Sequence, residues 1–386
     1  MTSETIKDAK RALAECRFED AISILEDNLD EDDTDPDTLV LLGIAYVQAE
    51  DAEKAVNVLR TADELLEEHC VVSLFLGRAL EALGELDEAE IHLRRAIRLD
   101  PDEPEAWKDV GRILLAQKRY AELIETTREA VSQFSDNAYL RSLYAIGLYR
   151  LGDYTGACRQ WYEVYKRRPE SLLALSNFAY MLLKQKRTRK VKTYIEQAIR
   201  INPEDSRTLF LQGELYFQQG NYQKAKKFFE QALDKQKTNL TPLSRLAVIA
   251  YREGKKEKCD DLIAQVREIG KDNPHSWKVL AYIYEELEEY DKLVDCLLEF
   301  VSDNHCSAAP WVKLATAYEK LGLADEAEHA WTMSFKLRRY VKIHCRHCGT
   351  YLRLPYEKQE GFDIHRNRNC LECNSVIPMP DALADI

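Results

Sequence analysis

The chain has 386 residues, of which 45% are hydrophobic and 31% charged, and its formal net charge at pH 7 is −13. This share of hydrophobic residues is enough to bury a core, which excludes a largely unfolded chain. The longest apolar run, Leu39 to Val47, is shorter than the ~18 to 20 residues that a membrane helix needs, and no apolar signal region begins the chain. We therefore expect a soluble cytoplasmic protein without a membrane span.

A residue no larger than alanine recurs every 34 residues from Ala9 onward, ten times in all. Twelve residues after each of these positions the side chain is small or apolar, and four residues further on it is bulky, except at Thr127. Small residues let two helices approach closely, and large ones fill the groove between neighbouring pairs. Each 34-residue unit is therefore predicted to be two antiparallel helices. The ten small positions are Ala9, Gly43, Gly77, Gly111, Ala145, Ala179, Gly213, Ala247, Ala281 and Ala315.

Around these positions runs the pattern LGxxY followed by G-[DN]-Y-xx-A, as in LGIAY at Leu42 to Tyr46 and LQGELYFQQGNYQKA at Leu211 to Ala225. It resembles the tetratricopeptide repeat. The resemblance implies an all-α, right-handed superhelical solenoid of about ten helix-turn-helix units, with ten 34-residue repeats covering residues 2–341. The turn glycine of the pattern is replaced in five units by Cys16, Glu50, Lys118, Lys186 and Glu288.

The same resemblance implies a concave groove lined by the first helix of each unit. At its inward positions, aromatic side chains alternate with cations. A guanidinium pairs with carboxylates and an aromatic ring supplies rigid contact area, so the expected partner is a protein or an extended peptide with acidic and apolar side chains. The candidate groove residues are Lys108, Arg112, Tyr149, Arg150, Tyr180, Lys184, Phe210, Phe217, Tyr251, Arg252, Lys278 and Tyr282.

The densest basic run, KQKRTRKVK from Lys184 to Lys192, falls on the turn between the two helices of the sixth unit. Such a run is most simply a solvated turn. The alternative is a contact for an acidic partner or a nucleic acid.

Near the C-terminus, two Cys-x-x-Cys pairs are separated by 21 residues: Cys345 with Cys348, and Cys370 with Cys373. This is the spacing of a four-thiolate tetrahedral site, and a structural zinc ion is the expected occupant. Iron, as in rubredoxin, is the rival because the same thiolates bind it well. The sequence favours a module at residues 342–386 that resembles a zinc ribbon and has three short strands.

A tight Cys-x-x-Cys turn tends to place the residue after it in the left-handed conformation, which glycine and asparagine tolerate best. Gly349 and Asn374 occupy those two positions. We therefore expect a left-handed backbone at each.

No motif typical of catalysis accompanies the repeats, since neither a phosphate-binding loop, a nucleophile elbow nor a metalloprotease helix is present. The sequence therefore predicts a non-catalytic adaptor or scaffold that uses the groove, with the ribbon as a second docking surface. Two alternatives remain open: a nucleic-acid-associated protein that uses the basic ribbon and the Lys184 to Lys192 run, and an iron-containing electron carrier built on the repeats.

Overall fold

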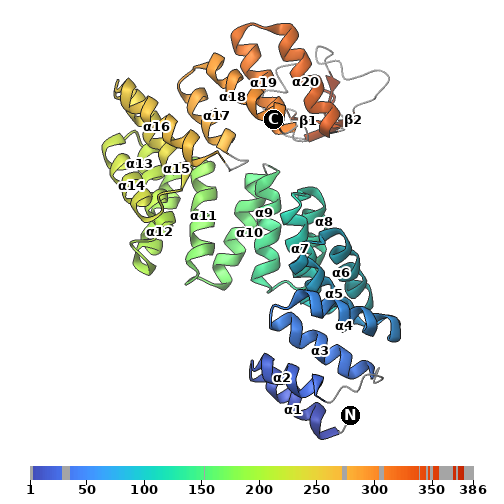
Figure 1. The fold of residues 1–386 in the computed structure, drawn as a ribbon. Coiled ribbons are helices and arrows are strands. Elements are labelled where there is room, and N and C mark those ends of the chain that lie inside the picture. The colour runs from blue at the N-terminus through green and yellow to red at the C-terminus, as the bar shows by residue number, and fades with distance from the viewer. Residues whose placement is uncertain are drawn as a thin grey trace. The chain divides into compact units, whose positions relative to one another are not determined.

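The computed structural model describes residues 3–27, 35–151, 153–271, 276–303, 308–338, 340–344, 347, 351–355, 368–370 and 373–377. Within these ranges the chain forms twenty helices followed by four short strands (Figure 1). It divides into two compact units, Met1–Asn202 and Pro203–Ile386. Each unit is a run of helix pairs, as the 34-residue period predicts.

The first unit contains six helix pairs. Their helices are α1 (Ser3–Ala14), α2 (Phe18–Glu26), α3 (Pro36–Gln48), α4 (Ala52–Leu65), α5 (Cys70–Leu83), α6 (Leu86–Leu99), α7 (Pro104–Ala116), α8 (Tyr120–Gln133), α9 (Ala138–Arg150), α10 (Tyr154–Arg167), α11 (Leu172–Lys184) and α12 (Thr188–Ile201).

The second unit contains four helix pairs and the strands. Its elements are α13 (Ser206–Gln218), α14 (Tyr222–Lys235), α15 (Leu240–Arg252), α16 (Lys256–Ile269), α17 (Ser276–Glu286), α18 (Tyr290–Asp303), α19 (Ala308–Leu321), α20 (Ala324–Arg338), β1 (Tyr340–His344), β2 (Tyr351–Pro355), β3 (Arg368–Asn369) and β4 (Val376–Ile377).

The repeated small residues lie where the two helices of a pair are closest. A Cβ atom added to Gly77 would lie 2.6 Å from the side chain of Leu93, and one added to Gly213 would lie 2.5 Å from the ring of Phe229. Neither distance is compatible with van der Waals contact, so the close approach of the helices excludes a side chain at these positions. This confirms that the small residue repeated every 34 positions allows the two helices of a pair to approach closely.

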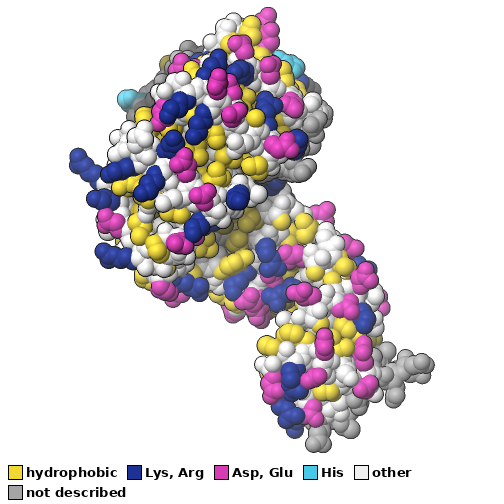
Figure 2. All heavy atoms as spheres, turned by 60° about the vertical axis from the view of Figure 1, so that its left-hand side comes forward, with side chains coloured by type: hydrophobic (Ala, Val, Ile, Leu, Met, Phe, Trp, Pro, Cys, Tyr) yellow, Lys and Arg dark blue, Asp and Glu magenta, His cyan; other side chains and the backbone are white. Residues whose placement is uncertain are grey.

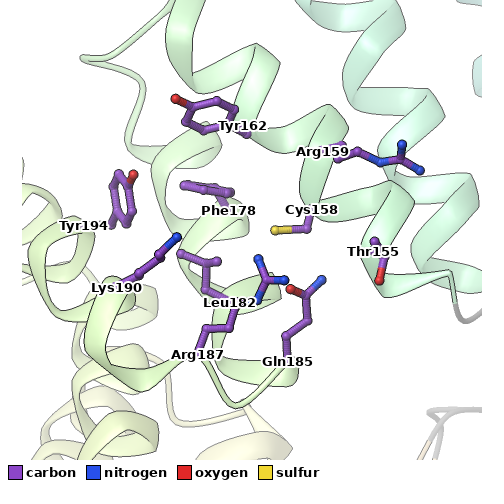
Figure 3. A pocket seen from close by; sticks show the side chains of 10 residues that line it. All are labelled: Thr155, Cys158, Arg159, Tyr162, Phe178, Leu182, Gln185, Arg187, Lys190 and Tyr194. Atoms are coloured by element: carbon purple, nitrogen blue, oxygen red, sulfur yellow. The ribbon is translucent and has the colours of Figure 1, made fainter.

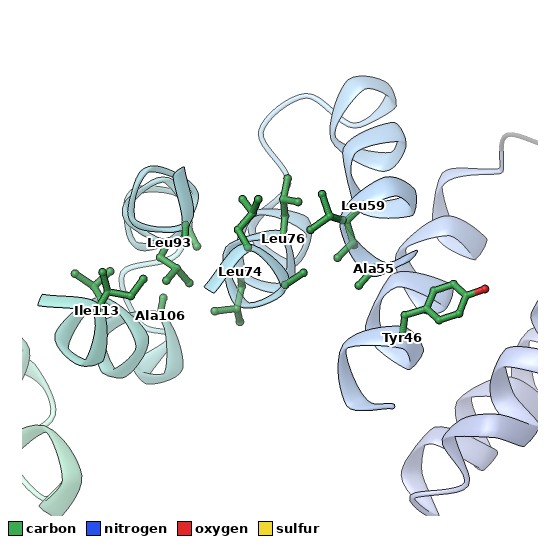
Figure 4. Packing of buried hydrophobic residues seen from close by; sticks show 14 of the residues in the cluster. Tyr46, Ala55, Leu59, Leu74, Leu76, Leu93, Ala106 and Ile113 are labelled. Atoms are coloured by element: carbon green, nitrogen blue, oxygen red, sulfur yellow. The ribbon is translucent and has the colours of Figure 1, made fainter. Parts of the chain in front are cut away.

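The bulky residues that follow each small position by sixteen residues, here called the bulky row, form the core between successive helices. In the first unit, Leu59 of α4 and Leu93 of α6 belong to this row, and they share one buried cluster with Leu76 of the intervening helix α5 (Figure 4). Thr127 stands in this row as a polar exception, fully buried, and its hydroxyl donates to the carbonyl of Leu123. The internal hydrogen bond satisfies its polar atom, which is why the core accepts it.

All five residues that replace the turn glycine adopt the left-handed backbone conformation. Cys16, Glu50, Lys118, Lys186 and Glu288 have φ between 56° and 62°, and the described turn glycines have φ between 74° and 85°. The turn geometry is therefore the same in both groups. The substitutions change its conformational energy, not its shape.

The strands pair in two separate antiparallel hairpins, β1 with β2 and β3 with β4. The expectation of a three-stranded ribbon is therefore wrong for the described residues. Each Cys-x-x-Cys pair falls between the two strands of one hairpin. Each pair thus separates two strands of its own, which gives four strands in place of three.

Candidate functional site

All twelve candidate groove residues lie on first helices, as expected: six on α7, α9 and α11 in the first unit, and six on α13, α15 and α17 in the second. The two units contain different arrangements of these side chains. On the face shown in Figure 2, basic and acidic side chains lie interspersed, with hydrophobic side chains between them.

Both candidate cations on α7 are held in ion pairs, Lys108 with Glu105 of the same helix and Arg112 with a residue of a neighbouring helix. Arg112 donates to Glu81 of α5 at 2.7 Å and lies 3.1 Å from Asp109, while Arg78 donates to Asp109 at 2.6 Å. Burial raises the pKa of Asp109, and the two guanidinium groups oppose that rise. These charges already stabilise one another, so they attract an acidic partner less strongly than unpaired cations would.

The candidates on α9 and α11 form an aromatic cluster. The ring centroid of Tyr149 lies 6.2 Å from that of Tyr180 and 5.7 Å from that of Tyr154. The ammonium of Lys184 lies 5.3 Å from the Tyr180 centroid. Burial, together with the neighbouring Tyr180, raises the pKa of Tyr149 to about 12, so its hydroxyl stays protonated at neutral pH. Arg150, at the end of α9, is exposed.

In the second unit, Phe210 and Phe217 have different environments. Phe210 is only 8% exposed and its ring packs against Phe229 at 5.6 Å, as a core residue does. Phe217 is half-buried, with the guanidinium groups of Arg245 and Arg252 at 5.5 and 5.4 Å from its centroid. Of the two, Phe217 is therefore the one that can contact a partner.

A buried ion pair lies beneath this surface. Arg245 of α15 donates to Glu214 of α13 at 2.7 Å, and its guanidinium lies 4.0 Å from the ring centroid of Tyr282. On the surface, Arg252 donates to Glu286 at 2.7 Å. Burial raises the pKa of Tyr282.

Arg245 and Glu214 were not among the residues predicted from the sequence, although the spacing of charged residues contains a signal for them. Several oppositely charged residues are 31 residues apart, three fewer than the length of one repeat. They form hydrogen-bonded pairs: Arg78 with Asp109, Arg112 with Glu81, and Arg245 with Glu214. Two of the pairs, Arg78 with Asp109 and Glu214 with Arg245, join the same two repeat positions on the first helices of adjacent repeats. In the Glu81–Arg112 pair both positions lie three residues further along the repeat, about one helical turn.

Tyr251 and Lys278 complete the candidate set in the second unit. Tyr251 is 40% exposed, which leaves much of its ring available to a partner. Lys278 is exposed at the start of α17, and its ammonium lies 5.6 Å from the centroid of Trp277.

Of the four candidate metal ligands, Cys370 and Cys373 are described, and Cys345 and Cys348 lie outside the described residues. Cys370 is 2% exposed, and its carbonyl accepts a hydrogen bond from the amide of Asn374 at 2.9 Å. Asn374 has φ of 56°, which confirms the left-handed residue expected after this pair. Gly349, expected to be its counterpart, lies outside the described residues. No three metal-ligating side chains come together in the part of the chain that is described.

Helix pairs that repeat every 34 residues and stack through their first and second helices define a helical-repeat protein. Sequence models of the tetratricopeptide repeat match residues 12–68, 71–113, 173–205, 194–227 and 216–283, which together span more than half of the chain. The chain belongs to the tetratricopeptide-repeat family.

Known proteins share parts of this architecture. The type IV pilus assembly protein PilF of Pseudomonas aeruginosa is 23% identical over 149 residues, which are 38% of this chain and 59% of PilF. A solved tetratricopeptide repeat protein from Parabacteroides merdae is 15% identical, with a TM-score of 0.51 over 67% of this chain and 97% of its own. Yeast Tom70 is 17% identical, with a TM-score of 0.43 over 86% of this chain and 84% of its own.

The chain therefore matches less than two thirds of the length of PilF. At 15% identity, the likeness to the Parabacteroides merdae structure shows the fold alone. Across the described ranges, none of the helices combines the length and the hydrophobicity that crossing a bilayer requires.

Proposed function

We propose that the protein is a non-catalytic scaffold that binds an extended segment of a partner protein through aromatic side chains on its first helices. The observation that carries this proposal is that partly exposed rings lie beside cations in both units: Tyr180 beside Lys184, and Phe217 beside Arg252. Aromatic and arginine side chains contribute most to the binding energy of protein interfaces. The expected partner segment carries apolar side chains for the rings and carboxylates for the cations.

The first test removes one ring from each of three first helices. Tyr180→Ala, Phe217→Ala and Tyr251→Ala combined in one chain should reduce partner capture at least about tenfold, since each truncated anchor removes on the order of 1 kcal/mol. The partner is first identified by photo-crosslinking from position 251 in the native cell, and its affinity is then measured with purified proteins.

A matched control truncates three exposed apolar residues on second helices instead. Ile91 on α6, Ile201 on α12 and Leu298 on α18 are 65%, 43% and 42% exposed. Changing them to alanine should leave partner affinity within about twofold, because isolated exposed apolar side chains contribute little. Equal affinities for both triple variants, with helical content intact by circular dichroism, would refute the first-helix surface.

We further propose that Cys345, Cys348, Cys370 and Cys373 bind one structural zinc ion, and that the module they hold is a second docking surface. Support comes from Cys370, which is buried, and from Asn374 directly after Cys373, which has the left-handed conformation that a metal-binding Cys-x-x-Cys turn favours. Four cysteine ligands leave no open coordination position, so the ion would stabilise the fold and supply no chemistry. Iron is the alternative occupant that metal analysis distinguishes.

We place the protein in a reducing compartment, which we propose is the cytoplasm. Five described cysteines that are not candidate ligands are free thiols: Cys16 in a turn, and Cys70, Cys158, Cys259 and Cys296 in helices. Thiols persist where glutathione and thioredoxin keep them reduced.

A further inference from the structure

A pocket of about 450 Å³ lies within the first unit, between α10, α11 and the start of α12 (Figure 3). We name it the α10–α12 pocket. Phe178 and Leu182 of α11 line it, whereas the groove candidates Tyr180 and Lys184 come two residues after each of them. Two residues of α-helix turn the side chain by about 200°, so the pocket and the first-helix surface use opposite sides of α11.

The floor of the pocket is apolar and buried. Phe178, Leu182 and Cys158 are 5%, 3% and 7% exposed. The rings of Tyr162 and Tyr194 contact Phe178, with centroids at 5.2 and 4.8 Å. An aromatic wall of this kind is rigid, and the volume falls in the range of sites that bury a small ligand or a large side chain.

Three cations surround this floor, and the residues that line the pocket include no carboxylate. They are Arg159 of α10, Arg187 at the start of α12 and Lys190 of α12. None of the three forms an ion pair within the described ranges, in contrast to Arg112 on α7 and Arg245 on α15. In Figure 3, Arg187 and Lys190 extend toward Leu182. The pocket is therefore positive beside an apolar surface, in a chain whose net charge is −13.

The lining also contains one buried acceptor without a hydrogen bond, the side-chain oxygen of Gln185. The side-chain amide of Gln185 donates to the carbonyl of Tyr154 at 3.1 Å, and its oxygen is buried without a hydrogen bond. A buried acceptor of this kind destabilises the protein until a donor reaches it. A peptide N–H would satisfy it, whereas a phosphate oxygen would not.

The aromatic rings of the pocket favour a peptide over a nucleic acid as its ligand. Bases bind single-strand sites by stacking on open aromatic faces. The Phe178 ring is covered by Tyr165, which stacks on it at 6.1 Å, and the Tyr162 ring has the ammonium of Lys166 at 5.7 Å. The open part of the pocket therefore suits one apolar side chain with flanking carboxylates better than a row of stacked bases.

We propose that the α10–α12 pocket binds an acidic peptide segment of a partner protein. One large apolar side chain of the segment lies on Phe178 and Leu182, and its neighbouring carboxylates pair with Arg159, Arg187 and Lys190. This binding site is separate from the first-helix surface, so a scaffold with both would hold two segments at once. The Lys184 to Lys192 run, interpreted from sequence as a solvated turn, contributes two of the three cations.

The test measures fluorescence anisotropy of a labelled peptide, GDEFLDEG, with the full chain at low salt. Arg187→Glu combined with Lys190→Glu should weaken binding at least about tenfold, because two attractive charges become repulsive. The matched control combines Arg189→Glu with Lys192→Glu on the same helix. It changes the charge equally, and neither residue lines the pocket. Affinity within about threefold of the parent chain is expected for the control.

Three further measurements make the proposal falsifiable. A peptide with glycine in place of the phenylalanine and leucine should bind at least about tenfold more weakly, since its apolar contact is lost. The triple first-helix variant should keep the parent affinity. A single-stranded DNA dodecamer of mixed sequence should not displace the peptide.

Absence of peptide binding to the parent chain, or an equal loss in the pocket variant and its control, would overturn the proposal. Displacement by the DNA would assign the pocket to nucleic acid instead. A loss in the triple first-helix variant alone would assign the peptide to the first-helix surface, so failure here is distinguishable from failure of the proposed function. Circular dichroism confirms that each variant is folded.

Discussion

At the scale of single residues, the turns inside the repeats show how one backbone conformation accommodates different side chains. Glu50 and Lys118 occupy the left-handed region, which costs a residue with a Cβ atom about 1–2 kcal/mol. Gly84 occupies it without that cost, and a Cβ atom added there would meet nothing within 4 Å. The difference between these turns is therefore conformational, and it can be measured by exchanging the residues.

Glu50→Gly should raise the free energy of unfolding by about 0.5–1 kcal/mol, because glycine relieves the left-handed strain and loses only part of that gain through its unfolded-state entropy. Urea denaturation followed by circular dichroism measures the change. The reverse exchange, Gly84→Ala, should destabilise the protein by a similar amount. A destabilising Glu50→Gly would show that the side chain, not the backbone, determines the energy of this turn.

At the scale of elements, ion pairs between first helices of adjacent repeats accompany the apolar core. Arg245 and Glu214 are 8% and 6% exposed, so the pair that joins α15 to α13 is almost fully buried. Removal of one member of such a pair is more damaging than replacement of both, because a buried charge then loses its partner.

Glu214→Ala should therefore lower the free energy of unfolding by about 3 kcal/mol. The double change of Glu214→Leu with Arg245→Met should lower it less, since no charge then remains buried at this position. For comparison, Glu196 lies 3.9 Å from Lys192 in an exposed pair on α12, and Glu196→Ala should change stability by less than about 0.5 kcal/mol. Equal effects at the two sites would show that the buried pair contributes no more than a surface pair.

At the scale of the whole molecule, the stability of the repeats comes from contacts between neighbouring helix pairs. Each helix pair buries its apolar face against its neighbours, so a run of repeats is stable without a ligand. For the segment after α20 we propose a different source, the metal ion held by the four cysteines, because metal binding can supply folding free energy that a small core does not.

Replacement of two of the proposed ligands, Cys370→Ser with Cys373→Ser, should remove one zinc ion per chain and leave the helical circular dichroism signal nearly unchanged. Metal analysis and an absorption spectrum of protein from its natural metal background measure the loss. Red protein with one iron would favour the electron carrier instead. Zinc retained in the variant would exclude these cysteines as its ligands.

The sequence was sufficient to predict the helix pairs, because a small residue every 34 positions is required wherever two helices must touch. It was also sufficient to place all twelve groove candidates on first helices. It could not show that Phe210 is part of the core or that Arg112 is paired, since those states depend on side chains from the neighbouring helix.

The family and the fold were thus readable from the sequence by itself, because both depend on local periodicity and on helix contacts that repeat identically. The tertiary structure alone decided which charges remain available to a partner. Arg245 is neutralised by Glu214 in the adjacent repeat, whereas Arg187 and Lys190 line a pocket with Phe178 that has no carboxylate in its lining. Electrostatic attraction depends on distances in space, and a linear spacing fixes those distances only where the repeat is regular.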